Sequence, residues 1–156
     1  MTFINRTTGI VLAFFLTLFF INVPSFASDN QIQAGVSNQI FDKVKQNENW
    51  KLAFFTGKDA QIVFMNITPA TNPANEIGME THKFDQIIFV VEGNGNAILD
   101  GKPTLVKSGD MIFIPQGVAH NVINMNKNKP LKILSVYSAT DIPANSTYKK
   151  KSDAQD

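Results

Sequence analysis

Only two histidines occur in this 156-residue chain, and each lies in a short run that contains other side chains able to bind a metal ion. His82 lies in the run Gly78-Met-Glu-Thr-His-Lys-Phe-Asp-Gln86, and His120 follows Gly109, Pro115 and Gly117. Apolar, strand-like segments bounded by glycine or proline adjoin both runs. We therefore expect each histidine to lie on a strand or at the end of one.

The first run places three metal-binding groups at even-numbered positions, Glu80, His82 and Gln86. Successive side chains on a strand point to opposite faces, so these three share one face if the pairing is regular. Polar groups that project into an apolar interior are costly to bury unless something satisfies them, and a divalent cation would do so. His120 would be the fourth ligand. The alternative is a hydrogen-bonded pair of Glu80 and Gln86 in a wet cavity without metal.

The second run resembles a known motif. The cupin superfamily carries glycine, five residues, proline, one residue, glycine, two residues, histidine, three residues and asparagine. This pattern fits Gly109, Pro115, Gly117, His120 and Asn124. The resemblance covers about residues 47–153 and implies a jelly-roll barrel with a metal site inside it.

The first cupin motif is present in altered form. Its usual pattern is glycine, five residues, His-x-His, three or four residues, glutamate, six residues and glycine. Here Glu80 replaces the first histidine, His82 matches the second, Gln86 replaces the glutamate and Gly93 closes the motif. This version is similar to small single-domain bacterial cupins described as mannose-6-phosphate-isomerase-like, a label that reflects fold and not reaction.

The rest of the chain predicts an all-β fold, an antiparallel jelly-roll β-barrel preceded by a short helical segment near Ile40, Phe41 and Val44. The Asp100-Gly101 pair favours a tight hairpin turn of the primed type. Frequent turn signals separate the candidate strands, which span 52–56, 61–68, 78–81, 86–92, 96–99, 104–106, 111–114, 120–124 and 131–138.

Several residues near the two runs are expected to have structural roles. Asp85 should cap or bridge on the outside of the sheet, Asp110 should stabilise its turn, and Asn124 should satisfy backbone groups. The aromatic side chains of this region are expected in the core or in a pocket wall: Phe84, Phe89, Phe113 and Tyr137.

The N-terminus is typical of an export signal. Arg6 precedes an apolar stretch over residues 9–21, and Ser25-Phe26-Ala27 is a small-x-small cleavage site. The predicted organisation is a signal peptide at 1–27, a polar lead-in with a short helix at 28–46, the cupin barrel at 47–140 and a polar tail at 141–156. Cleavage would leave the protein periplasmic or secreted without a stable membrane span, and retention as an anchor is the alternative.

Composition narrows the function classes. The net charge is +1, and the single basic run at 149–151 is followed by acidic residues, so a nucleic-acid partner is not expected. The chain has no cysteine, which excludes disulfides and thiolate ligands.

Two functions fit the predicted site. The first is a metal-dependent enzyme of isomerase, lyase or oxygenase type that acts on a small sugar- or acid-like molecule, with Glu80 as a general base. The second is a non-catalytic binding protein that uses the same cavity. Mn, Fe, Ni and Zn all accept such ligands. The resemblance also implies a homodimer.

Overall fold

The computed structural model of the protein describes residues 34–72 and 74–154. The predicted signal peptide at 1–27 lies outside these residues. None of the described helices is long and apolar enough to cross a membrane. The elements, in chain order, are α1 (Ile40–Gln46), β1 (Lys51–Thr56), β2 (Gln61–Ile67), β3 (Gln86–Glu92), β4 (Asn94–Leu99), β5 (Lys102–Lys107), β6 (Met111–Ile114), β7 (His120–Asn124), β8 (Leu131–Tyr137), β9 (Thr147–Tyr148) and the 3-10 helix η1 (Lys151–Ala154).

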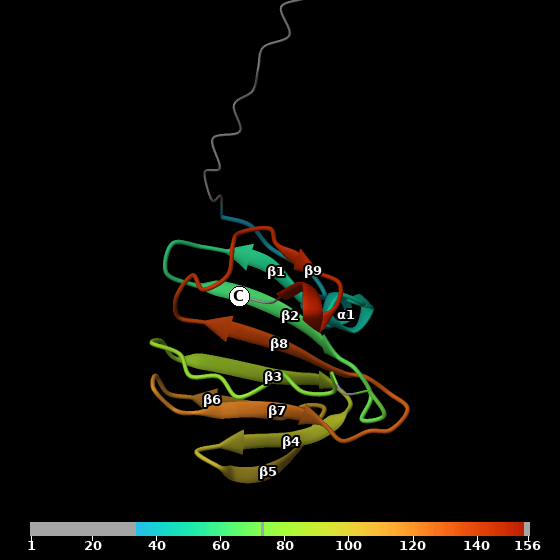
Figure 1. Cartoon of the computed structure of the whole chain (residues 1–156). Helices are drawn as coiled ribbons and strands as arrows, with labels where there is room; N and C mark the ends of the chain where they lie inside the picture. Colours follow the sequence, from blue (N-terminus) through green and yellow to red (C-terminus); the bar gives the residue numbers. More distant parts are fainter. Residues whose placement is uncertain (1–33, 73, 155–156) are drawn as a thin grey trace, which may run out of the picture. The chain divides into compact units, whose positions relative to one another are not determined.

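The strands form two antiparallel sheets (Figure 1). The six-stranded sheet has the order β6-β3-β8-β2-β1-β9, and the three-stranded sheet has the order β5-β4-β7. One apolar cluster contains residues of both sheets, among them Val63 of β2, Ile88 of β3 and Val122 of β7. The sheets therefore share a core, which confirms the predicted all-β jelly roll, although the described strands form two separate sheets and not one closed barrel.

Side-chain alternation in β2 explains how both faces of the larger sheet are covered. Val63, Met65 and Ile67 point into the core between the sheets. Phe64 points to the other face, where it packs in a second cluster with Val44 of α1. Period-two alternation with apolar residues on both faces requires cover on both sides, and α1 supplies part of it. The short helix is where the sequence predicts it.

A buried lysine closes the end of α1. The ammonium group of Lys132 on β8 donates hydrogen bonds to the carbonyl oxygens of Lys45 and Asn47. Lys132 is 8% exposed, so these bonds compensate for burying its charge. The last carbonyls of a helix have no partner within it, and a cation there also interacts favourably with the helix dipole.

Two turns carry the backbone conformations that their residues favour. Asp100 and Gly101, between β4 and β5, both have positive φ, 47° and 76°, which confirms the predicted primed turn. Gly93, between β3 and β4, has φ 93°, and a Cβ atom there would lie 2.7 Å from the carbonyl oxygen of Pro130. Only glycine fits at this position, which closes the first cupin motif.

The segment predicted as a strand at 78–81 is not one, and this prediction is wrong. The segment makes a single bridge, from Glu80 to His120, and another single bridge precedes it, from Glu76 to Ile123. Gly78 has φ 106°, outside the extended region, and its N–H bonds to the side chain of Asn121 at 3.0 Å instead of to a backbone carbonyl. The ladder beside β7 is therefore interrupted between the two bridges.

The C-terminal segment contains structure that the sequence does not reveal. Over its described residues, the predicted polar tail at 141–156 holds β9, which pairs with β1, and η1. Ile142, Tyr148 and Ala154 pack against the core cluster. These residues contribute one apolar side chain at a time, a pattern too sparse to mark an element.

Candidate metal centre

Backbone pairing sets Glu80 beside His120. The N–H of each residue donates to the carbonyl oxygen of the other, both at 2.9 Å. In an antiparallel pair, residues directly opposite each other project their side chains to the same face. The carboxylate of Glu80 and the imidazole of His120, forty residues apart in the chain, therefore become neighbours.

His82 reaches the same place from a loop. It follows the Glu80 bridge and precedes β3, so the expectation of a strand is correct for His120 and wrong for His82. The N–H of Gly117 donates to the carbonyl oxygen of His82 at 2.9 Å. Gly117 has φ 83°, a conformation that favours glycine. The two motifs thus contact each other directly, and the second one fixes the backbone of the first.

Aromatic side chains hold the His82 ring. Phe84 stacks on it with ring centroids 4.6 Å apart and an interplanar angle of 13°. The His120 ring lies at 5.1 Å and the Tyr137 ring at 5.6 Å, both tilted. Phe84 and Tyr137 therefore form walls of the site, as predicted.

Three of the four predicted ligands converge. One ligand atom each from Glu80, His82 and His120 lies within 4.8 Å of the other two. A first-row metal ion binds nitrogen and oxygen at ~2.0–2.2 Å, so two of its ligands lie up to ~4.4 Å apart. Small side-chain rotations would close the remaining difference.

The fourth predicted ligand, Gln86, lies on the inner face next to this group. It pairs in register with Tyr137 on one side and Ile114 on the other. Directly paired residues share a face, so Gln86 sits beside the ring that contacts His82. Its amide nitrogen donates to Ser135 Oγ at 3.3 Å, and the side chain is 1% exposed.

Unpartnered polar atoms distinguish this site. Among the described residues, His82 Nε2, His120 Nε2 and Gln86 Oε1 are buried without a hydrogen-bond partner. Glu80 Oε2 lies 3.4 Å from His82 Nε2, but the two atoms lack hydrogen-bond geometry. Buried polar groups almost always have partners, and an orphaned one costs about 1–3 kcal/mol. Three such atoms from ligand-type side chains in one region fit a bound cation.

The tautomer of His120 fits the same conclusion. Its Nδ1 lies 2.9 Å from the carbonyl oxygen of Val118, an acceptor, so the proton is assigned to Nδ1. The lone pair of the neutral ring is then on Nε2, the unpartnered atom. Metal-binding histidines usually donate their other N–H to a carbonyl or carboxylate in this way.

The ionisation of the site follows from its surroundings. Burial raises the pKa of Glu80, but contact with His82 and the positive charge of Lys51 outweigh burial and hold the pKa below its usual value. Glu80 is therefore a carboxylate at neutral pH. Burial, together with the negative charges of Glu80 and Asp141, raises the pKa of Tyr137, so its hydroxyl keeps its proton.

Asn121 positions the segment that carries Glu80, and the sequence does not assign it this role. Its side-chain oxygen accepts from the N–H of Gly78 at 3.0 Å, and its nitrogen donates to Glu76 Oε2 at 2.6 Å. These bonds replace the missing strand ladder. The sequence signal that could have indicated this role is the position of Asn121 directly after His120. Neighbouring residues on a strand point to opposite faces, so the Asn121 side chain faces away from the ligands.

The expected structural roles of three polar residues are confirmed. Asp85 accepts from the N–H of Gln116 at 2.8 Å, and Asp110 accepts from the N–H of Lys107 at 2.8 Å. Asn124 donates to the carbonyl oxygens of Ile67, Thr68 and Lys129 and accepts from the N–H of Asn126.

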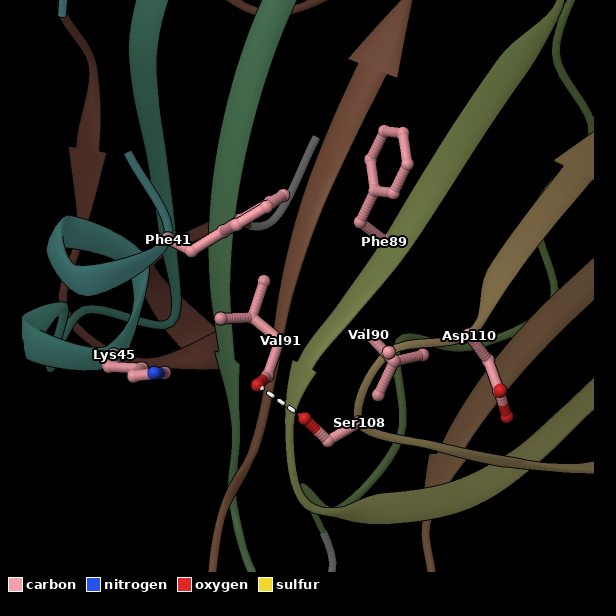
Figure 2. Close-up of a pocket in the computed structure, with 8 residues that line it drawn as sticks. Phe41, Lys45, Phe89, Val90, Val91, Ser108 and Asp110 are labelled. Carbon is pink, nitrogen blue, oxygen red and sulfur yellow. Dashed lines mark hydrogen bonds between the residues drawn. The ribbon is translucent and has the colours of Figure 1, made fainter. Parts of the chain in front are cut away.

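A different pocket, of about 340 Å³, lies between α1 and the β3 and β6 region (Figure 2). Phe41, Phe89 and Val91 line it, and none of the four predicted ligands does. Ser108 Oγ donates to the carbonyl oxygen of Val91 at 2.8 Å (Figure 2). Phe89 is thus a pocket-wall residue as expected, whereas Phe113, 51% exposed on β6, is not in the core. Phe113 is wrongly predicted because β6 is an edge strand that alternates between a buried and an exposed face.

Comparison with known proteins agrees with the fold and the motifs. The model of the cupin domain family matches residues 70–137, which include all four predicted ligands. The solved structure of the BH2720 protein from Bacillus halodurans is 31% identical, covers 81% of this chain and 96% of its own, and superposes with a TM-score of 0.73. The chain belongs to the cupin family.

Two curated relatives extend over most of this cupin. The YrkC protein of Bacillus subtilis is 32% identical over 117 residues, which are 70% of this chain and 60% of YrkC. The L612 protein of Acanthamoeba polyphaga mimivirus is 30% identical over 118 residues, 73% of this chain and 71% of L612. This cupin therefore spans about 60% of the length of YrkC.

Proposed function

We propose that this cupin is an exported metal-dependent enzyme that acts on a small oxygenated molecule, sugar- or acid-like. Glu80, His82 and His120 would hold a divalent transition metal, with Gln86 as the fourth ligand. The observation that carries the proposal is the group of unpartnered buried atoms His82 Nε2, His120 Nε2 and Gln86 Oε1 beside an ionised carboxylate.

The metal would supply Lewis-acid polarisation of a carbonyl or hydroxyl oxygen of the substrate. The chain supplies orientation. The Val118 carbonyl fixes the His120 ring, and the Gly117 N–H fixes the backbone of His82. Phe84 and Tyr137 form apolar walls that exclude water from the two rings, and exclusion of water strengthens electrostatic interactions inside.

Glu80 is the proposed general base. Its side chain lies next to His82 and is the only carboxylate in the candidate cluster that the described residues form. If Glu80 binds the ion with one oxygen, the other oxygen remains to accept a proton from the substrate. Replacement by Gln keeps the size of the side chain and one oxygen that can bind the ion, and it removes the base.

A non-catalytic binding protein is the second candidate. It is favoured by Gln86, because a neutral amide oxygen binds a cation more weakly than the carboxylate of the family pattern. In this case the same polar lining would hold a small sugar or acid without turnover.

Turnover separates the two functions. Mature protein, loaded in turn with Mn, Fe, Ni or Zn, is incubated with panels of hydroxy acids, oxo acids and small sugars, and products are followed by NMR. The enzyme reading predicts a product whose rate depends on metal and falls in Glu80→Gln. Saturable binding of a panel compound by the loaded protein, without any product, would instead establish the binding protein.

Export is part of the proposal and has its own test. The chain is expressed in a bacterial host, and the intact mass of the purified protein is measured in the periplasmic and external fractions. We expect a form that begins at Ser28, because cleavage follows the small-x-small site. A full-length, membrane-associated form would support the anchor instead.

A further inference from the structure

A pocket of about 370 Å³ lies where β2 ends at Ile67. The metal centre belongs to the other end of this strand, where Gln61 pairs with Tyr137. The volume lies within the range of small-molecule sites. None of the four predicted metal ligands is among the described residues that line the pocket. The described lining residues are Glu48, Trp50, Asn66, Thr68, Asn72, Ala74, Lys149, Lys150, Lys151 and Ser152.

The pocket is strongly basic on one side. Lys149, Lys150 and Lys151 all line it, and Glu48 is the only acidic residue among the described lining residues. Lys151 is held in place, because its ammonium group donates to the carbonyl oxygen of Glu76 at 2.8 Å and lies 5.6 Å from the centre of the Trp50 ring. The basic run, which the sequence predicts to be part of a polar tail, thus lines a cavity and is held there through Lys151.

Two polar atoms in the same wall have no partner. Within the described part of the chain, Asn66 Oδ1 and Thr68 Oγ1 are buried and make no hydrogen bond. The amide nitrogen of Asn66 donates to the carbonyl oxygen of Glu48 at 3.1 Å, which orients Oδ1 as a free acceptor. Thr68 offers a hydroxyl that can donate or accept. Unpartnered buried groups are rare in folded proteins. A bound ligand that supplies their hydrogen bonds would explain why the fold keeps these two.

We propose that this pocket binds a small soluble organic oxyanion that carries hydroxyl groups. Its phosphate or carboxylate group pairs with the lysine ammonium groups, and its hydroxyls bond to Asn66 Oδ1 and Thr68 Oγ1. Lysine binds such oxyanions as a compact point charge with three donors. This inference concerns residues outside the metal centre and holds whether or not the proposed function is correct.

The chain offers a direct reporter. Trp50 is its single tryptophan and lines the pocket under Lys151. Glycerol 3-phosphate, citrate and inorganic phosphate are titrated into the mature protein, and binding is followed by isothermal calorimetry and by Trp50 fluorescence. Vesicles of phosphatidylglycerol are a parallel arm, because a lipid headgroup offers the same phosphate chemistry.

Two variants test the assigned contacts. The double variant Lys149→Gln, Lys150→Gln should raise the Kd of glycerol 3-phosphate by about tenfold. The protein should still fold, because neither ammonium group makes a hydrogen bond among the described residues. Thr68→Val should raise the Kd by about fivefold, the value of one neutral hydrogen bond. It should not lower the melting temperature of the ligand-free protein, since Thr68 Oγ1 has no partner within the described protein.

The matched control is Lys102→Gln, Lys107→Gln, which makes the same change in net charge on β5. It should bind glycerol 3-phosphate as the wild type does. The proposal is overturned if calorimetry detects no saturable binding of glycerol 3-phosphate or citrate, whether or not inorganic phosphate binds. It is also overturned if both double variants weaken binding equally. Binding to vesicles alone would also overturn it, because the site would then recognise a membrane surface and not a soluble anion.

Discussion

The buried polar side chains at the two ends of β7 differ in how many of their polar atoms are hydrogen-bonded. Asn124, at the last position, makes four hydrogen bonds to backbone groups. His120, at the first position, makes one hydrogen bond through Nδ1, and its Nε2 has no partner. The nearby atoms His82 Nε2 and Gln86 Oε1 also have no partner. The side chains of Asn124 and His120 are both almost completely buried, so exposure to water does not explain the difference.

The difference separates a structural polar residue from a functional one. A side chain whose every polar atom is bonded within the protein stabilises the fold and has nothing left to offer a ligand. A group of ligand-type atoms that the fold orients and leaves unbonded costs stability until something binds. The Asn124 end of the strand therefore holds loops together, and the His120 end is the candidate site.

The largest expected effect is at the structural end. Asn124→Ala removes the partners of three carbonyl groups and one N–H, and should lower the free energy of unfolding by about 3–5 kcal/mol. Urea unfolding followed by circular dichroism measures it. The folded fraction should still bind metal with wild-type stoichiometry. A loss below about 1 kcal/mol would mean that water replaces these bonds and that the contrast is weaker than the structure indicates.

Metal binding should stabilise the other end. At a free metal concentration of 100 times the Kd, the free energy of unfolding should rise by ~2.7 kcal/mol, because the folded chain alone presents the assembled site. Paired urea titrations with and without metal measure this, and addition of EDTA should reverse it. His120→Ala is the control and should show no rise. An equal rise in the control would show that metal binds elsewhere.

A smaller effect is expected at the residue that positions Glu80. Asn121→Ala removes the bonds to Gly78 and Glu76 and should weaken metal affinity by about tenfold, ~1.4 kcal/mol, as is usual for residues behind the ligands. Competition with a metal-sensitive dye gives the affinity. Since Asn121 does not contact the ligands' free atoms, unchanged affinity would show that the His120 bridge alone holds Glu80.

The smallest effect compares two glutamines on one row of the larger sheet. Gln86→Leu removes an unpartnered oxygen and one hydrogen bond, from Nε2 to Ser135 Oγ. Metal-free stability should therefore change by no more than ~1 kcal/mol, while metal affinity falls. Gln61→Leu is the matched control, because Gln61 makes four hydrogen bonds and should lose several kcal/mol. Thermal and urea unfolding of both variants measure the two changes in stability. Equal losses would remove the distinction between a fully bonded amide and an amide whose oxygen has no partner.

Much of the fold follows from local signals in the sequence. The alternation of β2, the Asp100-Gly101 turn and the glycines of both motifs each dictate their conformation through nearby sterics and patterning. The candidate ligands follow from residue type and motif spacing. His82 and Glu80 converge with His120 as expected, although the segment 78–81 that carries Glu80 is not the predicted regular strand.

The remaining features depend on contacts between distant residues. Asn121 bonds across to Gly78 and interrupts the ladder, a choice that no local pattern in either segment reveals. Lys151 lies over Trp50, which is 101 residues earlier in the chain. The run of lysines alone therefore does not predict the cavity beside it. Long-range pairing also determines that β9 closes the sheet edge beside β1.

The most direct test of the central claim is the metal content of the protein, purified from its native compartment without chelator or metal-affinity tags. Elemental mass spectrometry is applied to the wild type, to His82→Ala, to His120→Ala and to Lys102→Gln as an unrelated surface control. The account predicts about one transition metal per chain in the wild type and the control, and loss of it in both histidine variants. A correctly folded wild type without metal, which also fails to bind added Mn, Fe, Ni or Zn, would contradict it.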